Sequence, residues 1–332
     1  MKIKTFLYKS LVLIIVFGFV SCSDDSKDNS QMSEQGNGQV EEKVFLGDIV
    51  LRTQEEVNVF GAENYTRITG DIDLGFTDNQ SNINDLSPLS SLTSVGRDFK
   101  MGFLTSLPNL NGLQNLERIE GTQAEIRADR IINLEGLTSL NYVGDRLSIY
   151  GTSIENLNGL PNLTTIGSLE IRNSKIENLN GLSNLVSLEG IGLFQNINLI
   201  NLNGLDNLTN IGWIFLSGNP NLINLNGLDN ITNVGSIGLS SNPNLIDLSG
   251  LENLTDVESI FLTFNDNFKN LNGLDNLTTR LTSIYIESNP LLDDFCNLEY
   301  VFVNYGFADS YAVFGNAYNP TQQDIIDGNC SL

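Results

Sequence analysis

The most informative absence in this 332-residue sequence is histidine, which does not occur at all. Histidine is the commonest general base in enzymes and the commonest metal ligand, so its absence excludes a Ser-His-Asp hydrolase and argues against a metal site. Basic residues are also scarce, with 17 Lys and Arg against 40 Asp and Glu and a net charge of -23. Because clustered Lys and Arg are needed to bind a phosphate backbone, we expect no nucleic-acid partner.

Long apolar runs are equally rare, and the clearest one, residues 11–20, follows a Lys-rich start. It is too short to span a bilayer and is typical of an export signal. The small residue Ser21 followed by Cys22 resembles the cleavage box of bacterial lipoproteins, which implies a signal peptide over 1–21 and acylation of Cys22. The alternative is an ordinary secretory signal with an incidental cysteine.

Residues 22–43 lack an apolar period and are rich in polar and charged side chains. Such a segment cannot offset its own ordering entropy, so we interpret it as a flexible acidic tether. The acidic Ser-Asp-Asp directly after Cys22 is similar to signals that send some Gram-negative lipoproteins to the outer face of the outer membrane, although acidic linkers are common. We therefore expect a lipid-anchored outer-membrane protein that is exposed at the cell surface, held by acyl chains rather than by charge.

What the sequence does contain is a repeat. Eight Gly-Leu pairs recur between residues 112 and 274 at steps of 22 to 24 residues, and self-similarity at that period is the mark of a solenoid. From Val234 to Asn242 one copy follows the pattern L-x-x-L-x-L-x-x-N. This pattern resembles the leucine-rich repeat, and the resemblance covers about residues 68–290.

The resemblance implies a repeat solenoid of the α/β type, with a parallel β-ribbon of about ten turns and return segments made of turns or 3₁₀ helix. In each copy the apolar residues of a short strand alternate toward the core, as Ile237 and Leu239 do, while Gly238 and Ser240 face out. An asparagine three residues beyond the last apolar strand residue matches the family's buried ladder, whose amides satisfy backbone groups. The expected ladder consists of Asn196, Asn219, Asn242, Asn265 and Asn289.

Both ends of a solenoid must be covered, and each flank of the repeats has its own composition. Within residues 44–67, Thr53 and Glu56 form a capping-box pattern that predicts a short capping helix. Residues 291–332 are richer in aromatic side chains and include Cys296 and Cys330. In an exported protein these two cysteines are expected to form a disulfide, with unpaired thiols as the alternative.

The outward strand positions are not needed for the core, so we predict that they carry recognition. Lys and Arg are absent from 176–268, which separates an arginine-containing group on earlier repeats from an aromatic group on later ones. The arginines can instead neutralise nearby acids, and the aromatic side chains can instead pack along the sheet or against a cap. The ligand-binding candidates are Arg127, Arg146, Tyr150 and Arg172, followed by Phe194, Trp213, Phe215, Phe261 and Tyr285; the other outward positions include Lys100, Glu125, Ser148, Glu170 and Phe264.

The combination of these phrases resembles bacterial receptor L-domain-like proteins and, more distantly, internalin-type repeats. That resemblance implies a non-enzymatic scaffold that binds a protein or a glycan, without cofactor or metal and as a monomer. The sequence lacks the dense cysteines of receptor L-domains and has a different anchor from internalins, so no specific partner follows. A structural envelope protein that self-associates is the alternative, and an exported hydrolase is a more distant one.

Overall fold

The computed structural model describes residues 42–75, 81–102, 104–127, 129–151 and 153–332. The expected signal peptide 1–21, its acylation site Cys22 and nearly all of the tether 22–43 lie outside the described residues. Within the described ranges, no helix combines the length and the apolar character needed to cross a bilayer.

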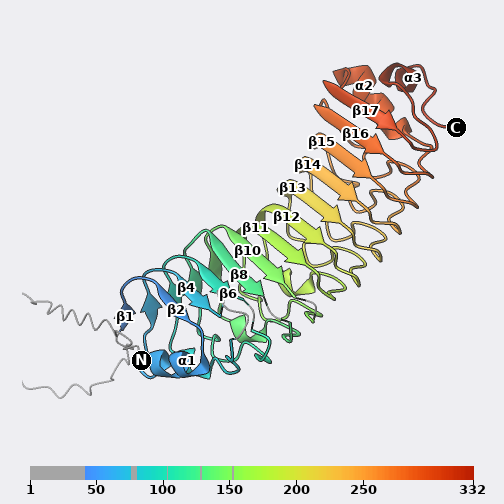
Figure 1. Ribbon diagram of the computed structural model, residues 1–332. Coiled ribbons are helices and arrows are strands. Elements are labelled where there is room, and N and C mark those ends of the chain that lie inside the picture. Colours follow the sequence, from blue (N-terminus) through green and yellow to red (C-terminus); the bar gives the residue numbers. More distant parts are fainter. Residues whose placement is uncertain (1–41, 76–80, 103, 128, 152) are drawn as a thin grey trace, which may run out of the picture. The chain divides into compact units, whose positions relative to one another are not determined.

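The described residues form a parallel β-solenoid in which successive turns of the chain contribute successive strands to one sheet (Figure 1). Its main ladder contains twelve strands in the described residues, and ten of them fall within 68–290, as the repeat count predicts. These strands are β2 (Ile49–Leu51), β4 (Ile72–Leu74), β6 (Phe99–Met101), β8 (Gln123–Arg127), β10 (Arg146–Tyr150), β11 (Thr165–Arg172), β12 (Ser187–Phe194), β13 (Asn210–Ser217), β14 (Asn233–Ser240), β15 (Asp256–Thr263), β16 (Ser283–Glu287) and β17 (Ser310–Phe314).

The earlier turns carry a second, shorter ladder beside the first. It consists of β1 (Val44–Phe45), β3 (Arg67–Ile68), β5 (Ser94–Val95), β7 (Arg118–Ile119) and β9 (Tyr142–Val143). Val143 and Leu147 are four residues apart, whereas the equivalent Ile166 and Leu169 are three apart. The shorter step lets β11 run unbroken and pair with both β9 and β10. In each turn from β11 to β15, the positions of both ladders therefore lie on one continuous strand of eight residues.

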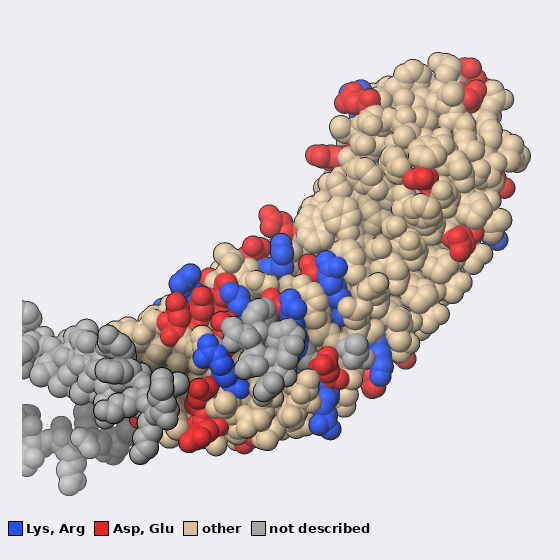
Figure 2. All heavy atoms as spheres, in the orientation of Figure 1, with Lys and Arg blue, Asp and Glu red and all other residues tan. Residues whose placement is uncertain are grey.

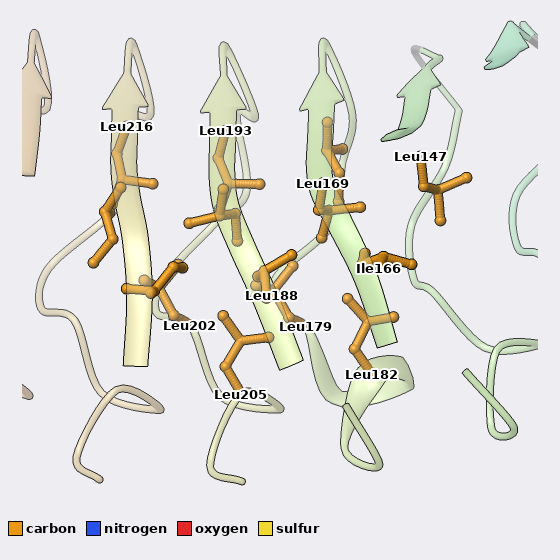
Figure 3. Packing of buried hydrophobic residues seen from close by; sticks show 14 of the residues in the cluster. Leu147, Ile166, Leu169, Leu179, Leu182, Leu188, Leu193, Leu202, Leu205 and Leu216 are labelled. Carbon is orange, nitrogen blue, oxygen red and sulfur yellow. The ribbon is translucent and has the colours of Figure 1, made fainter. Parts of the chain in front are cut away.

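The core consists of Leu and Ile side chains from the strands, which meet Leu side chains from the return segments. Figure 3 shows this for Leu193 on β12 and Leu202 and Leu205 on a return segment, all of them inaccessible to solvent. Burying one such side chain stabilises the fold by roughly 2 kcal/mol. The return segments are turns with short 3₁₀ helices: η1 (Ser87–Leu89), η2 (Glu135–Leu137), η3 (Asn180–Leu182) and η4 (Cys296–Leu298). The fold is thus a leucine-rich repeat solenoid with little α-helix.

The recurring Gly of each return segment is needed for close stacking of the turns. Gly227 has φ of +103°, a backbone conformation that L side chains rarely adopt. A Cβ at this position would also overlap the carbonyl of Leu202 in the preceding turn. The Gly-Leu pair that reveals the repeat period therefore marks a steric requirement of the solenoid.

The asparagine ladder runs along the solenoid where each strand turns away from the sheet. All five predicted members are inaccessible to solvent. The Nδ2 of Asn242 donates to the Leu216 carbonyl at 3.0 Å, and its Oδ1 accepts the backbone N–H of Asn219 at 3.1 Å. Ser174 precedes the ladder and Asn316, which the repeat count does not include, extends it into the C-terminal cap. Each side chain thus satisfies two backbone groups of the preceding turn.

The N-terminal end of the solenoid is covered by α1 (Gln54–Gly61), which packs Val57 and Phe60 on the core. The Thr53 side chain accepts the backbone N–H of Glu56, and the Glu56 carboxylate accepts the backbone N–H of Thr53. The predicted capping box is therefore present.

The C-terminal end is covered by α2 (Glu299–Tyr305), β17 and α3 (Gln322–Ile326). Cys296 on η4 and Cys330 after α3 are joined by a disulfide, with their Cα atoms 4.9 Å apart. The disulfide ties the last residues of the chain to the end of the repeat core.

Candidate binding surface on the sheet

The outward side chains of β8 to β16 form three columns, because the strands pair in register. We call this surface the outward face, its part on β8, β10 and β11 the charged half, and its part on β12 to β16 the aromatic half. The middle column of the face is made of Glu125, Ser148, Glu170, Gly192, Phe215, Gly238, Phe261 and Tyr285. The sequence-predicted ligand candidates all lie in these three columns.

In the charged half, two arginines form ion pairs with glutamates of the same strand. The Arg127 side chain forms an ion pair with Glu125, which also accepts a hydrogen bond from the Gln123 amide at 2.7 Å. The Arg127 guanidinium lies 4.7 Å from the centre of the Tyr150 ring. Arginine in such a setting is held by both the carboxylate and the aromatic face.

Strand β11, two strands along the sheet from β8, repeats this arrangement. Glu170 accepts hydrogen bonds from Arg172 and from the Tyr150 hydroxyl, the latter at 2.9 Å. Partial burial would raise the pKa of the Glu170 carboxyl, but its bonds to Arg172 and Tyr150 outweigh burial and hold that pKa below its usual range. The Arg172 guanidinium lies 4.1 Å from the centre of the Phe194 ring, so it joins the charged half to the aromatic half.

Two outward positions differ from the sequence-based expectation. Glu125 and Ser148 were expected to be exposed, yet Glu125 is only 4% exposed and Ser148 is inaccessible. Both stand in the middle column, where longer side chains on either side cover them. Among the arginines, Arg146 is exposed, and its charge contributes to the lowered pKa of Glu170. The alternative interpretation, in which the arginines neutralise nearby acids, therefore describes Arg127 and Arg172, while Arg146 remains exposed.

In the aromatic half, the large rings lie over glycines of the sheet. Trp213 and Phe215 stack with ring centres 5.3 Å apart and planes inclined by 25°. A Cβ at Gly190 on β12 would overlap the Trp213 indole, and a Cβ at Gly238 on β14 would overlap the Phe215 ring. Outward positions with a large aromatic residue are thus next to positions with glycine on an adjacent strand. Each ring occupies the space above the backbone of that glycine.

These rings are partly exposed rather than buried. Phe215 is 38% and Phe261 is 37% exposed, and Trp213 is half-buried. Phe261 faces Tyr285 on the next strand, and Tyr285 contacts Phe314 on β17 edge to face at 5.7 Å. The aromatic side chains therefore continue from Phe194 toward the C-terminal cap along one side of the sheet.

Sequence reasoning placed Phe264 with this group and missed Phe314. Phe264 is exposed, but it has φ of +57° and lies in the turn beyond β15, outside the three columns. Phe314 lies in the last strand, where the sequence no longer follows the repeat pattern, so its outward position could not be predicted from the period. Only its pairing with β16 brings it beside Glu287 and the neighbouring Tyr285.

A shallow groove of about 620 Å³ runs beside the aromatic half, where β9 and β11 to β14 begin. Its floor includes Gly144, Gly167 and Gly212, whose missing side chains leave the backbone accessible. Glu189, the third residue of β12, lines the groove and is exposed. In the aligned repeats Glu189 occupies the same position as those glycines. Its place in the groove could therefore have been predicted from the sequence, but the sequence analysis did not identify it.

Charge is divided unevenly between the two parts of the protein. Residues 176–332 contain 17 acidic and two basic residues, whereas 42–175 contain 18 acidic and 11 basic residues. Figure 2 shows most of the visible Lys and Arg side chains over the N-terminal repeats and a largely uncharged surface over the C-terminal ones. No group of three or more acidic or cysteine side chains in the described ranges has the geometry of a metal site.

Comparisons with known proteins add a likeness to solved structures. No protein-family model matches the chain, and no curated protein matches it. Among solved structures, the chain is similar to an internalin, InlF, from Listeria monocytogenes, with 18% sequence identity and a TM-score of 0.43. The match covers 79% of this chain and 76% of the internalin.

Proposed function

We propose that this protein is an exported, lipid-anchored binding protein that holds a polypeptide partner on the aromatic half of its outward face. The single observation that carries the proposal is the partly exposed stack of Trp213 and Phe215 on a rigid sheet. Large apolar side chains exposed together on a soluble surface are typical of interaction sites, and Trp is enriched among the residues that dominate binding energy.

The architecture supports a binding role in a second way. The inward Leu and Ile fill the core in each turn, so the outward columns are not needed to fill it. In the charged half Arg127 and Arg172 are engaged with Glu125 and Glu170, whereas the aromatic half presents partly exposed rings to solvent. The chain also lacks histidine, and a binding scaffold needs no general base.

The binding role is tested with arrays of extracellular proteins and of oligosaccharides, probed with the purified protein. A protein hit is then measured with the variants Trp213→Ala and Phe215→Ala. We expect each to weaken binding by about ten- to thirty-fold, because truncated aromatic hot spots cost about 2 kcal/mol. Tyr300→Ala, an exposed aromatic on α2 away from the face, serves as the matched control and should bind normally. Binding that survives both face variants unchanged would falsify this assignment.

The lipid anchor and the surface location are part of the same proposal and are tested separately. Cells labelled with a fatty-acid analogue should incorporate it into the wild-type protein and not into a Cys22→Ser variant, which should leave the membrane fraction. Protease added to intact cells should degrade the wild-type protein while periplasmic proteins survive. Retention of the label in the variant would refute acylation of Cys22, and full protection from protease would refute surface exposure.

A further inference from the structure

The charges around the aromatic half indicate what kind of polypeptide it binds. We propose that the partner segment is basic, that one of its Lys or Arg side chains pairs with Glu189, and that a neighbouring apolar side chain lies on Trp213 and Phe215. This inference rests on the proposed function and specifies the chemistry of its partner.

The first step is the position of Glu189. It directly precedes Gly190, whose backbone lies beneath the Trp213 ring, and it lines the groove with the glycine floor. Glu189 is therefore one residue along β12 from the backbone that the Trp213 ring covers. A polypeptide that crosses β12 at this point can pair a cation with the Glu189 carboxylate and place a further side chain on the indole, the most favourable ring for cations.

The second step is the contrast between Glu189 and the other glutamates of the face. Glu125 is paired with Arg127, and Glu170 with Arg172 and Tyr150. Within the described residues, by comparison, the exposed Glu189 side chain has no hydrogen-bond or ion-pair partner. Its charge is thus available to a binding partner in a way that the other two are not.

The third step is the field around the groove. Lys and Arg are absent throughout 176–268, and Glu258 on β15 occupies the strand position equivalent to Glu189 and is also exposed. A basic side chain lies at the opposite end of the groove, where the Arg118 guanidinium is 4.2 Å from the centre of the Tyr142 ring. At the β12 end, acids without a paired base create a negative potential that attracts cations and repels acidic partners. Complementary charge therefore favours a basic polypeptide over a neutral or acidic one.

The groove itself suits a long basic side chain. Its floor of glycine backbone and buried Val143 and Leu188 is apolar, and its rim carries polar groups such as Asn210. Lys and Arg place their aliphatic stems along apolar surface and their charges at its edge. A neutral sugar can donate hydrogen bonds to the Glu189 carboxylate but brings no opposite charge to it, so a basic polypeptide is the better electrostatic match to this part of the face.

The test uses random twelve-residue peptides displayed on phage and selected against the purified protein, followed by binding measurements on the synthetic peptides recovered. We expect recovered sequences enriched in Lys or Arg next to Trp, Phe or Leu. Glu189→Gln, which keeps the side-chain shape, should weaken their binding by about three- to ten-fold and reduce its dependence on salt. Glu177→Gln, an exposed acid in the turn beyond β11, is the matched control and should change binding less than twofold.

The outcomes separate this inference from the proposed function. If recovered peptides lose binding in Phe215→Ala but are indifferent to Glu189→Gln, the aromatic half is the site and the basic partner is wrong. If binding is indifferent to all face variants, both proposals fall. Recovery of only neutral or acidic peptides, or binding of an oligosaccharide with no peptide recovered, also overturns the inference.

Discussion

The Phe215 ring on β13 lies over the backbone of Gly238 on β14, in the space that a side chain at Gly238 would fill. On the other side of β13, the Trp213 ring lies over Gly190 of the preceding strand, β12. Repeats with large outward residues and repeats with glycine are therefore complementary neighbours. This pairing explains why two copies that are nearly identical inside differ so much at their outward positions.

The Phe215–Gly238 contact can be measured with a double-mutant cycle. Gly238→Ala alone should destabilise the protein by about 1 kcal/mol or more, because the new methyl group displaces the ring. In a Phe215→Ala background the same change should be neutral or stabilising, since alanine restricts the unfolded chain more than glycine does. Urea denaturation gives the coupling energy, expected at about 1 kcal/mol.

Gly235→Ala provides the control for this cycle. A Cβ there would lie 2.5 Å from the Gly212 carbonyl oxygen, which is backbone and not a ring. Its cost should be the same with Phe215 or with alanine at position 215. Additive effects of Phe215→Ala and Gly238→Ala would show that the ring does not depend on the glycine.

The asparagine ladder predicts a large effect from one buried amide. Asn242→Ala removes the partner of the Leu216 carbonyl and of the Asn219 backbone N–H, both buried. Leaving these groups unpaired should lower the free energy of unfolding by roughly 2–4 kcal/mol. Asn244→Ala, two residues away and exposed, loses a bond to the Pro220 carbonyl and a long one, 3.4 Å, from the Asn267 amide, and should cost under about 1 kcal/mol. Equal costs in chemical denaturation would argue that the ladder has no special role.

Acid should weaken the charged half in a way that depends on Glu170. The folded-state pKa of this carboxyl is lowered, so its contribution to stability is present above its unfolded pKa of roughly 4.3 and is lost as pH falls through the lower folded value. Comparing melting temperatures of wild type and Glu170→Gln from pH 7 to pH 3 isolates this effect. The difference between them should shrink below about pH 5. A difference that stays constant to pH 3 contradicts the assignment.

Removing the disulfide should loosen the C-terminal cap. The sequence separation of 34 residues corresponds to a stabilisation of about 4 kcal/mol in the chain-entropy description. A Cys296→Ala, Cys330→Ala variant should show faster amide hydrogen exchange in residues 291–332, with little change in the central repeats, since each turn contacts only its neighbours. Uniform loss of protection along the whole chain would instead indicate that the cap and the repeats unfold as one unit.

Much of the fold could be predicted because every copy of the repeat has the same spacing of inward apolar residues. The capping box of Thr53 and Glu56 was equally readable, since it depends on residues three apart. The burial of Glu125 and Ser148 could not be predicted from the sequence, because it depends on side chains of adjacent turns more than 20 residues away. Asn316 was missed for a similar reason: it occupies the ladder position without the repeat phrase around it.

The sequence alone determined the period of the solenoid, the inward Leu and Ile and the positions that face outward, because these follow from spacing along the chain. Tertiary structure decided which outward side chains remain accessible. In-register stacking brings Arg127 to Glu125 and Tyr150 and lays Phe215 on Gly238. It also leaves Glu189 exposed, one residue from the glycine that the Trp213 ring covers. Accessibility and charge pairing depend on neighbours across the sheet, and those neighbours are set only when the turns stack.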